Sequence, residues 1–439
     1  MSSYRSRMAL RFLSLALLIA QVPEVWCGIP SSEFRERRAR LLALADTDAV
    51  LVFRSANGQT RSGDVTYPFR QESNLLYLTG ISEPGLTLLV IPRGADVDGK
   101  AARLMLFCPD DIATSIKEMK AFEDGRILGP ARFRQIFDSI VGSTRQLMLS
   151  GANLPFVEDW LNDRPMFLEQ EARQRLQGKY PDLKIRNAAL LVARLREFKS
   201  PAEIDAIREA IRVTGDGIRH AMALCRPGAA EYELQAALEY EMVRQGATGT
   251  GFPSIVGSGP NSLILHYDRN RRVMEDGEVV VMDVGAEMDG YSADITRTLP
   301  VSGTFTEEQR RVYATVLHVQ EEVIRMIRPG VRWSSIESRA REMIGAAGFP
   351  GRMTHGVSHH VGLDTHDVGE MDTLREGMVI TVEPGIYIEA SDTSFSAGYR
   401  GCGVRIEDDV LVGKDGAVVL SSNIPKDIET IETRTGRDR

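Results

Sequence analysis

The sequence predicts an α+β protein built from two domains, and three observations lead to this prediction. The chain has 439 residues, more than a single hydrophobic core normally serves. In the first half, short apolar runs typical of β-strands alternate with helical patterns. In the second half, long helical segments come first, and strand patterns dominate from Gly251 onward.

The composition is that of a soluble globular protein and argues against a nucleic-acid partner. Hydrophobic residues make up 43% of the chain and charged residues 26%, close to the usual values for globular domains. The formal net charge is −8, whereas a protein that binds nucleic acid normally presents a basic face. We therefore expect no nucleic acid among its ligands.

The N-terminal residues have the pattern of an export signal. Basic residues precede the apolar run Phe12–Val22, which is shorter than the roughly 20 residues needed to cross a bilayer but suits the core of a signal peptide. We expect residues 1–27 to be a signal peptide, cleaved after Ala20 or Cys27, and the mature protein to be periplasmic or secreted, with no stable membrane span. A buried first helix is the alternative.

Residues 29–187 predict a mixed domain of helices and strands. A helix begins at Ser31, and the apolar run Ala49–Phe53 predicts a buried strand. The remaining expected elements are a strand, turn and strand within Tyr67–Pro92, strands at Ala102–Phe107 and Gln146–Leu149, and helices at Ala131–Val141 and Phe156–Leu176.

Residues 188–425 predict the second domain, followed by a charged surface tail at 426–439. Ser200 and Pro201 begin a helix with an N-cap and a proline at the first helical position. The helical pattern that begins there is interrupted at residues 226–228, which include a proline and a glycine. Two further helices are expected near Thr306–Ile327 and Ser334–Gly345.

A predicted hairpin from Val279 to Pro300 places two carboxylates side by side. Asp283 ends an apolar run, Asp294 follows eleven residues later, and the text between them is GAEMDGYS, which is rich in turn formers. Buried carboxylates repel each other and are costly without a cation. The hairpin therefore predicts a cation site.

Further residues with metal-binding or acid–base chemistry lie in short clusters elsewhere in the second half of the chain. Alone, each has an ordinary structural explanation as a turn residue, a packed histidine or a surface ion pair. Together, several carboxylates in apolar strands need compensation, and an oxygen-rich donor set suits a pair of divalent ions such as Mn²⁺, or Co²⁺ or Zn²⁺. These groups are His266 in ILHY, His355, His359, His360 and His366 in HGVSHHVGLDTHD, Glu383 in TVEPGIYI, and Arg405 and Glu407 in GVRIEDDVLV.

The motifs ILHY, DVGAEMDGYSADITRT, HGVSHHVGLDTHDVG, VEPGIY and RIEDD closely resemble those of the Xaa-Pro aminopeptidases (aminopeptidase P), which are pita-bread metallopeptidases. FRERRARLL and YPFRQESNLLYLTGISEPG resemble the N-terminal domain of the same family. The resemblance thus covers nearly the whole mature chain and leaves out the signal segment. It implies an α+β pita-bread catalytic domain preceded by an α/β N-terminal domain.

The resemblance also implies a role for each matching residue. Asp294 and Glu407 would bridge two divalent ions, and a water or hydroxide between the ions would be the nucleophile. Glu383 would also accept the proton of the nucleophile, and Arg405 would hold Glu407. The implied metal ligands are Asp283, Asp294, His359, Glu383 and Glu407, and the further implied active-site residues are His266, His355 and His366.

The implied reaction is hydrolysis of the N-terminal Xaa-Pro bond of peptides. This bond is a tertiary amide without an N–H, and its ring restricts the backbone, so a pocket preformed for proline and a contact to the free N-terminal amine would select it. Release of the proline nitrogen needs a proton, which a histidine would deliver. The resemblance further implies a homodimer or homotetramer.

Other assignments share parts of this pattern. Prolidase, which cleaves only Xaa-Pro dipeptides, has the same five ligands. A metal-free binding module and the metal-independent creatinase type are disfavoured because all five ligand positions are filled. A methionine aminopeptidase would not need the long first domain.

Overall fold

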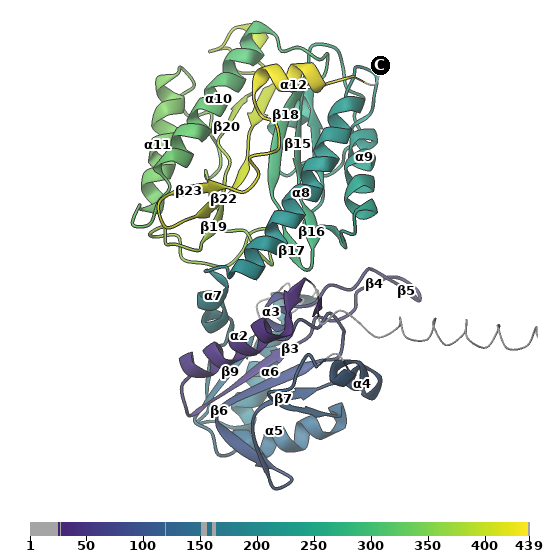
Figure 1. Cartoon of the computed structure of the whole chain (residues 1–439), viewed down its shortest axis with the longest axis vertical. Coiled ribbons are helices and arrows are strands. Elements are labelled where there is room, and N and C mark those ends of the chain that lie inside the picture. Colours follow the sequence, from purple (N-terminus) through teal and green to yellow (C-terminus); the bar gives the residue numbers. More distant parts are fainter. Residues whose placement is uncertain (1–24, 27, 119, 151–155, 160–163, 438–439) are drawn as a thin grey trace, which may run out of the picture. The chain divides into compact units, whose positions relative to one another are not determined.

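The computed structural model describes residues 25–26, 28–118, 120–150, 156–159 and 164–437. Most of the predicted signal peptide, residues 1–24 and Cys27, lies outside this part of the chain, so it stays a prediction. The chain divides into two compact units, Met1–Ala189 and Leu190–Arg439 (Figure 1).

No helix in the described residues has the length and apolar character needed to cross a bilayer.

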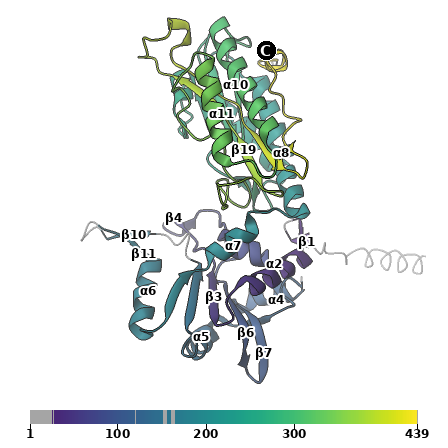
Figure 2. The ribbon, with the colours of Figure 1, turned by 90° about the vertical axis from the view of Figure 1, so that its left-hand side faces the viewer.

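The first unit is built on a six-stranded mixed sheet (Figure 2). Its strand order is β12-β9-β3-β6-β7-β8, with parallel pairing of β12 with β9, β9 with β3 and β7 with β8. The apolar side chains of β3, β6 and β7 form much of the core. The strands are β3 (Ala49–Arg54), β6 (Thr87–Val97), β7 (Lys100–Phe107), β8 (Arg126–Leu128), β9 (Gln146–Ser150) and β12 (Lys184–Asn187).

Helices surround this sheet, and short strand pairs complete the unit. The helices are α2 (Ser31–Leu44), α3 (Ser73–Thr79), α4 (Asp110–Glu118), α5 (Phe133–Val141) and α6 (Leu168–Lys179). The short strands are β1 (Val25–Trp26), β2 (Ile29–Pro30), β4 (Thr60–Ser62), β5 (Val65–Thr66), β10 (Phe156–Asp159) and β11 (Arg164–Phe167).

Two sequence-based predictions in this unit are wrong. The aromatic-rich text before the turn at residues 83–85 forms helix α3 rather than a strand, because Glu72 caps its N-terminus and Gly80 ends it in the left-handed conformation. The predicted helix over Phe156–Leu176 begins only at Leu168 and is preceded by strands β10 and β11. Pro165 explains this difference, since proline disrupts a helix interior.

In the second unit, strands run between two helix pairs, α8 with α9 and α10 with α11 (Figure 1). Ser200 and Glu203 form a capping box at the start of α8. Buried apolar side chains line one face of α8 and of α10. The helices are α7 (Ala189–Arg196), α8 (Pro201–Leu224), α9 (Glu231–Arg244), α10 (Glu307–Met326) and α11 (Trp333–Ala346).

The strands of this unit form small antiparallel sheets. Their orders are β14-β15-β18, β13-β16-β17, β19-β22-β23 and β20-β21. The strands are β13 (Gly249–Thr250), β14 (Ile255–Ser258), β15 (Val279–Val284), β16 (Ala286–Met288), β17 (Tyr291–Ser292), β18 (Ile295–Pro300), β19 (Val379–Val382), β20 (Gly385–Ile388), β21 (Cys402–Arg405), β22 (Asp408–Val412) and β23 (Ala417–Val419).

The predicted surface tail at 426–439 is instead packed onto the second unit over its described part. Helix α12 (Ile428–Arg434) begins at an Asp427 cap, and Ile431 is fully buried. Lys426 accepts a hydrogen bond from Tyr313 through its carbonyl oxygen (2.7 Å). Two isoleucines, Ile428 and Ile431, among charged and polar neighbours were too weak a pattern to predict this helix.

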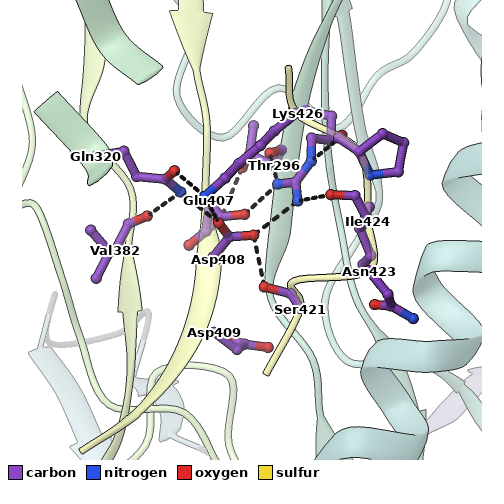
Figure 3. A network of polar contacts seen from close by, with 12 residues as sticks. Thr296, Gln320, Val382, Glu407, Asp408, Asp409, Ser421, Asn423, Ile424 and Lys426 are labelled. Atoms are coloured by element: carbon purple, nitrogen blue, oxygen red, sulfur yellow. Dashed lines mark hydrogen bonds and ion pairs between the residues drawn. The ribbon is translucent and has the colours of Figure 1, made fainter. Parts of the chain in front are cut away.

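A buried charge network joins this C-terminal segment to the sheets (Figure 3). Asp408 on β22 accepts hydrogen bonds from Arg297 (2.8 Å), Gln320 (3.0 Å) and Ser421 (2.7 Å), and it pairs with Lys426. Burial alone would raise the pKa of Asp408, but Arg297 and Lys426 hold it below its ordinary value. Asp408 therefore stays ionised as the anionic centre of the network.

Replacing Asp408 by alanine should lower the free energy of unfolding by about 3–5 kcal/mol, because the buried Arg297 would lose its carboxylate partner. Urea denaturation measures this change. Asp205→Ala removes one partner of an exposed pair with Arg208 and should cost about 1 kcal/mol or less. Equal losses in the two variants would contradict a structural role for the network.

Candidate active site

One cavity in the second unit, with a volume of about 560 Å³, brings the predicted site residues together. Its remaining wall is largely apolar and includes Phe252, Pro253 and Leu265, which the sequence did not single out. The predicted residues that line the cavity are His266, Asp283, Asp294, His355, His359, His366, Glu383, Arg405 and Glu407.

The hairpin of β15 and β18 forms one side of the site, as predicted. Asp283 lies opposite Thr296 in the antiparallel ladder, and Asp294 directly precedes β18. The Asp283 carboxylate lies near enough to Asp294 to contribute to raising the pKa of that carboxyl group. Gly285 allows the backbone to approach Ala293 closely, because a Cβ at this position would lie 1.8 Å from the carbonyl oxygen of Ala293.

Backbone hydrogen bonds fix the other three proposed ligands beside this hairpin. The His359 carbonyl accepts from the Thr381 amide (2.8 Å), and the Glu383 amide donates to Val357 (2.9 Å). Glu407 lies between β21 and β22 and donates its amide to the Thr296 carbonyl (3.1 Å). Each ligand is thus placed by strand pairing or by contacts to a strand end.

The donor atoms face one another as the ligands of a cation would. One donor atom each from Asp294, His359 and Glu407 lies within 4.8 Å of the others. His359 Nδ1 is 3.0 Å from the His360 carbonyl, which only accepts, so Nδ1 carries a proton, and in the neutral imidazole Nε2 presents its lone pair. That lone pair lies 3.4 Å from both Asp294 Oδ2 and Glu383 Oε1, a repulsive arrangement without a positive charge between them.

Burial and mutual repulsion also disfavour the ionised carboxylates. Burial and then the neighbouring carboxylates raise the pKa of Asp294 and of Glu407 well above ordinary values. Burial raises the pKa of Glu383 to about 7. Asp283 Oδ1 is buried without a hydrogen-bond partner. An oxygen-rich set with one imidazole fits divalent metal ions, which supply the missing positive charge.

Arg405 does not hold Glu407 directly, which corrects the role inferred from the sequence. Its Nη2 donates to Asp283 Oδ2 (2.6 Å) and its Nε donates to Thr296 Oγ1 (3.1 Å). Thr296 in turn donates to Glu407 Oε2 (2.7 Å). Alternation along β21 turns the Arg405 side chain toward β15 and β18, so the threonine mediates its contact with Glu407.

A hydrogen-bond chain fixes His355 as a neutral imidazole. Arg405 donates to Tyr387 Oη (2.9 Å), Tyr387 donates to His355 Nε2 (2.9 Å), and His355 Nδ1 donates to the Gly356 carbonyl (2.8 Å). Burial, with a contribution from Arg405, lowers the pKa of His355 to about 4. Its 3.5 Å contact with Glu383 is therefore not an ion pair at neutral pH.

The other histidines occupy different places around the cavity. His366 stacks on His359 with a ring-centroid distance of 4.0 Å. His266 lines the wall next to Leu265, after the short 3₁₀ helix Gly259–Leu263. His360 points away from the cavity, bonds the Glu370 carbonyl (3.2 Å) and packs against Trp333.

The sequence reasoning missed three polar residues that support the ligands. These are Thr296, Tyr387 and Asp409, and Asp409 Oδ2 accepts from the Asp294 amide (3.1 Å). Burial raises the pKa of Asp409 to about 8. Strand alternation contained a signal for two of them, since Thr296 follows Asp294 by two residues and Asp409 follows Glu407 by two.

Comparison with known proteins agrees with this geometry. Residues 205–414 match the Metallopeptidase family M24, and residues 34–145 match the Aminopeptidase P, N-terminal domain. The chain is 33% identical to the Xaa-Pro aminopeptidase of Escherichia coli over 92% of this chain and 97% of that protein. It is 32% identical to the human Xaa-Pro aminopeptidase 3 over 93% of this chain and 87% of that protein.

A solved structure extends the similarity to the whole fold. The aminopeptidase PepP of Pseudomonas aeruginosa superposes with a TM-score of 0.82 at 30% identity, covering 92% of this chain and 98% of that one. The chain therefore belongs to metallopeptidase family M24, in the group that joins this catalytic domain to an aminopeptidase P N-terminal domain.

Proposed function

We propose that this chain is a metal-dependent exopeptidase that hydrolyses the Xaa-Pro bond at the N-terminus of peptides. One observation carries this proposal: five proposed metal ligands and three further histidines line a single cavity in a chain of this family. Family membership supports a metallopeptidase, and the relatives named above support the preference for proline in the second position.

Two divalent ions are proposed to occupy the site, with Mn²⁺ as the first choice and Co²⁺ or Zn²⁺ as substitutes. Four carboxylates and one imidazole match the preference of such ions for hard oxygen donors. When bound, the ions would lower the pKa of a water molecule and stabilise negative charge on the carbonyl oxygen of the substrate. The proposed ligands are Asp283, Asp294, His359, Glu383 and Glu407, with Asp294 and Glu407 shared between the two ions.

The protein's own side chains would orient the peptide and move protons. Glu383 faces the cavity and would accept a proton from the attacking water. His266 and His366 line the cavity beside the ligands and would contact the substrate around its scissile bond. His355 would act as a neutral imidazole, because its hydrogen bonds fix the proton on Nδ1.

The apolar wall would favour proline at the second position. Phe252, Pro253 and Leu265 offer a surface without hydrogen-bonding demands, which suits a pyrrolidine ring and a tertiary amide that has no N–H to donate. Prolidase activity on dipeptides alone remains the second candidate, because the ligand set does not distinguish the two enzymes.

Export and self-association are also part of the proposal. The basic and apolar residues before Val22 support export, and mass spectrometry of the mature N-terminus in secreted or periplasmic fractions tests it. A homodimer or homotetramer is proposed from the family resemblance, and light scattering of the purified protein tests it.

Removing the metal should abolish hydrolysis of Xaa-Pro-Yaa peptides, and adding Mn²⁺ should restore it. The reason is that the proposed ions would activate the attacking water and stabilise the charge on the substrate carbonyl oxygen. Release of the N-terminal residue from Ala-Pro-Ala peptides, measured by chromatography before and after treatment with a chelator, provides the test. Ala-Ala-Ala is the matched control peptide. If the protein hydrolysed the dipeptide Ala-Pro but not the longer peptide Ala-Pro-Ala, the result would favour prolidase instead.

Asp294→Ala or Glu407→Ala should reduce turnover by at least about 10³-fold, since each removes a proposed shared ligand. Elemental analysis of the purified variants should also find less bound metal than in the unaltered protein. Asp415→Ala removes an exposed carboxylate outside the cavity and serves as the control. Full turnover in both ligand variants with metal in excess would exclude the two-metal mechanism.

His266→Ala should lower turnover by roughly 10²–10⁴-fold, in the range of a lost proton-transfer group, while metal content stays unchanged. Steady-state kinetics combined with elemental analysis separates these effects. A loss of metal in this variant would reassign His266 as a ligand.

A further inference from the structure

Outside the carboxylate cluster, the second unit contains a set of four charged groups, three of them buried, beside the loop that carries His366. Arg196 ends helix α7, and Lys199 directly precedes the cap of α8. Their side chains are 2% and 1% exposed, respectively. Both face carboxylates of the loop, Asp364 and Asp367.

The contacts in this set are specific and close. Arg196 Nη2 donates to Asp364 Oδ2 (2.6 Å) and to Asp367 Oδ1, and Lys199 Nζ donates to Asp367 Oδ2 (3.0 Å). Burial opposes ionisation of Asp367, but Arg196 and Lys199 hold its pKa below the ordinary value. Two cations and two anions thus compensate each other, so removing one leaves an uncompensated buried charge.

The same short segment also holds the far end of the loop. Glu197 Oε1 accepts from the Glu370 amide (3.2 Å) and from Arg375 Nη2 (2.7 Å). The Lys199 amide donates to the Gly377 carbonyl (2.8 Å). Residues 196–199 therefore act as a strap across the loop formed by residues 362–370.

Packing at Gly362 shows how closely the strap and the loop fit. A Cβ at this position would lie 2.1 Å from Asp367 Oδ2 and 3.0 Å from Lys199 Cε. Any side chain here would push the Asp367 carboxylate away from Lys199. Glycine is therefore required by the ion cluster itself.

His366 depends on this support more than the other histidines of the cavity. His355 and His359 have hydrogen bonds from their rings, whereas the His366 imidazole makes none within the described part of the chain. Its neighbours in the loop lack regular secondary structure. The position of His366 over His359 is therefore set by its backbone, which Asp364 and Asp367 anchor on both sides.

We propose that Arg196 and Lys199 are positioning residues for His366: by binding Asp364 and Asp367 they fix loop 362–370 so that the His366 imidazole stands over the metal site. This inference rests on the proposed function, because His366 is assigned there to the substrate. Neither cation touches the cavity, so both act through the loop.

A double-mutant cycle with His366 tests the inference. Arg196→Gln should lower kcat/KM on an Xaa-Pro-Yaa peptide by roughly 10- to 100-fold, the usual cost of losing a group that orients an active-site residue. In a His366→Ala background the same change should cost less than about threefold, because the residue it positions is gone. Arg196→Lys, which keeps the charge, should recover part of the loss.

The controls separate positioning from general damage. Arg208→Gln removes one partner of an exposed pair on α8 and should leave kcat/KM unchanged. Metal content should stay at the unaltered level in Arg196→Gln. If that variant does not fold, Asp364→Asn takes its place in the cycle, because this side chain is 31% exposed and its change is milder.

Hydrogen exchange of the metal-free protein provides a readout that does not depend on activity. Arg196→Gln or Asp364→Asn should speed amide exchange in residues 362–370 and leave β15 and β18 unchanged. Equal costs in both backgrounds of the cycle, metal loss, or unchanged exchange in the loop would each overturn the inference. Absence of Xaa-Pro hydrolysis by the unaltered protein, with faster loop exchange in the variant, would instead reject the proposed function.

Discussion

Repulsion among buried carboxylates is the constraint on which the second unit depends. Asp283, Asp294, Glu383 and Glu407 line one cavity, and Asp283, Asp294 and Glu407 are buried. Anions placed this way are unfavourable unless cations compensate them. The protein supplies Arg405 for Asp283 and leaves the remaining negative charge for metal ions. If side-chain cations compensated all four carboxylates, the cavity would not attract metal ions.

A second set of charged residues shows how the chain confines the uncompensated carboxylates to the cavity. Asp408 follows Glu407 directly in the sequence, but strand alternation turns it to the opposite side, where Arg297 and Lys426 neutralise it. Arg297 also donates to the Glu407 carbonyl (2.6 Å). The backbone that presents Glu407 to the cavity is therefore held by a permanently compensated network, while the side chain itself stays available to a removable cation.

The site was easier to predict from the sequence than parts of the fold, for a physical reason. A single carboxylate in an apolar strand has an ordinary structural explanation, but several buried together need compensation, so Asp283 and Glu407 carry their signal as members of a set. The helices that the sequence did not predict correctly have a weaker signal in their residue pattern. Helix α3 is buried on all sides and shows no amphipathic pattern, and α12 is anchored by Ile431 within charged text.

The motifs also do not determine which groups a side chain contacts in the folded protein. The text RIEDD suggested that Arg405 holds Glu407, its neighbour at the second position. The antiparallel pairing of β15 with β18 and the approach of β21 decide otherwise, since they bring Asp283 and Thr296 to the guanidinium instead. Such contacts depend on register between distant strands, which spacing within one segment does not determine.

Two ways of holding a histidine coexist around the cavity, and they differ in what they allow. His355 is held in one tautomer by the Tyr387 hydroxyl and the Gly356 carbonyl, which together occupy both of its ring nitrogens. Among the residues that the structure describes, His366 is held through its backbone and by stacking on His359. Its ring therefore keeps both nitrogens free for a substrate, and the ordering that its own hydrogen bonds do not supply must come from the ion cluster beneath the loop.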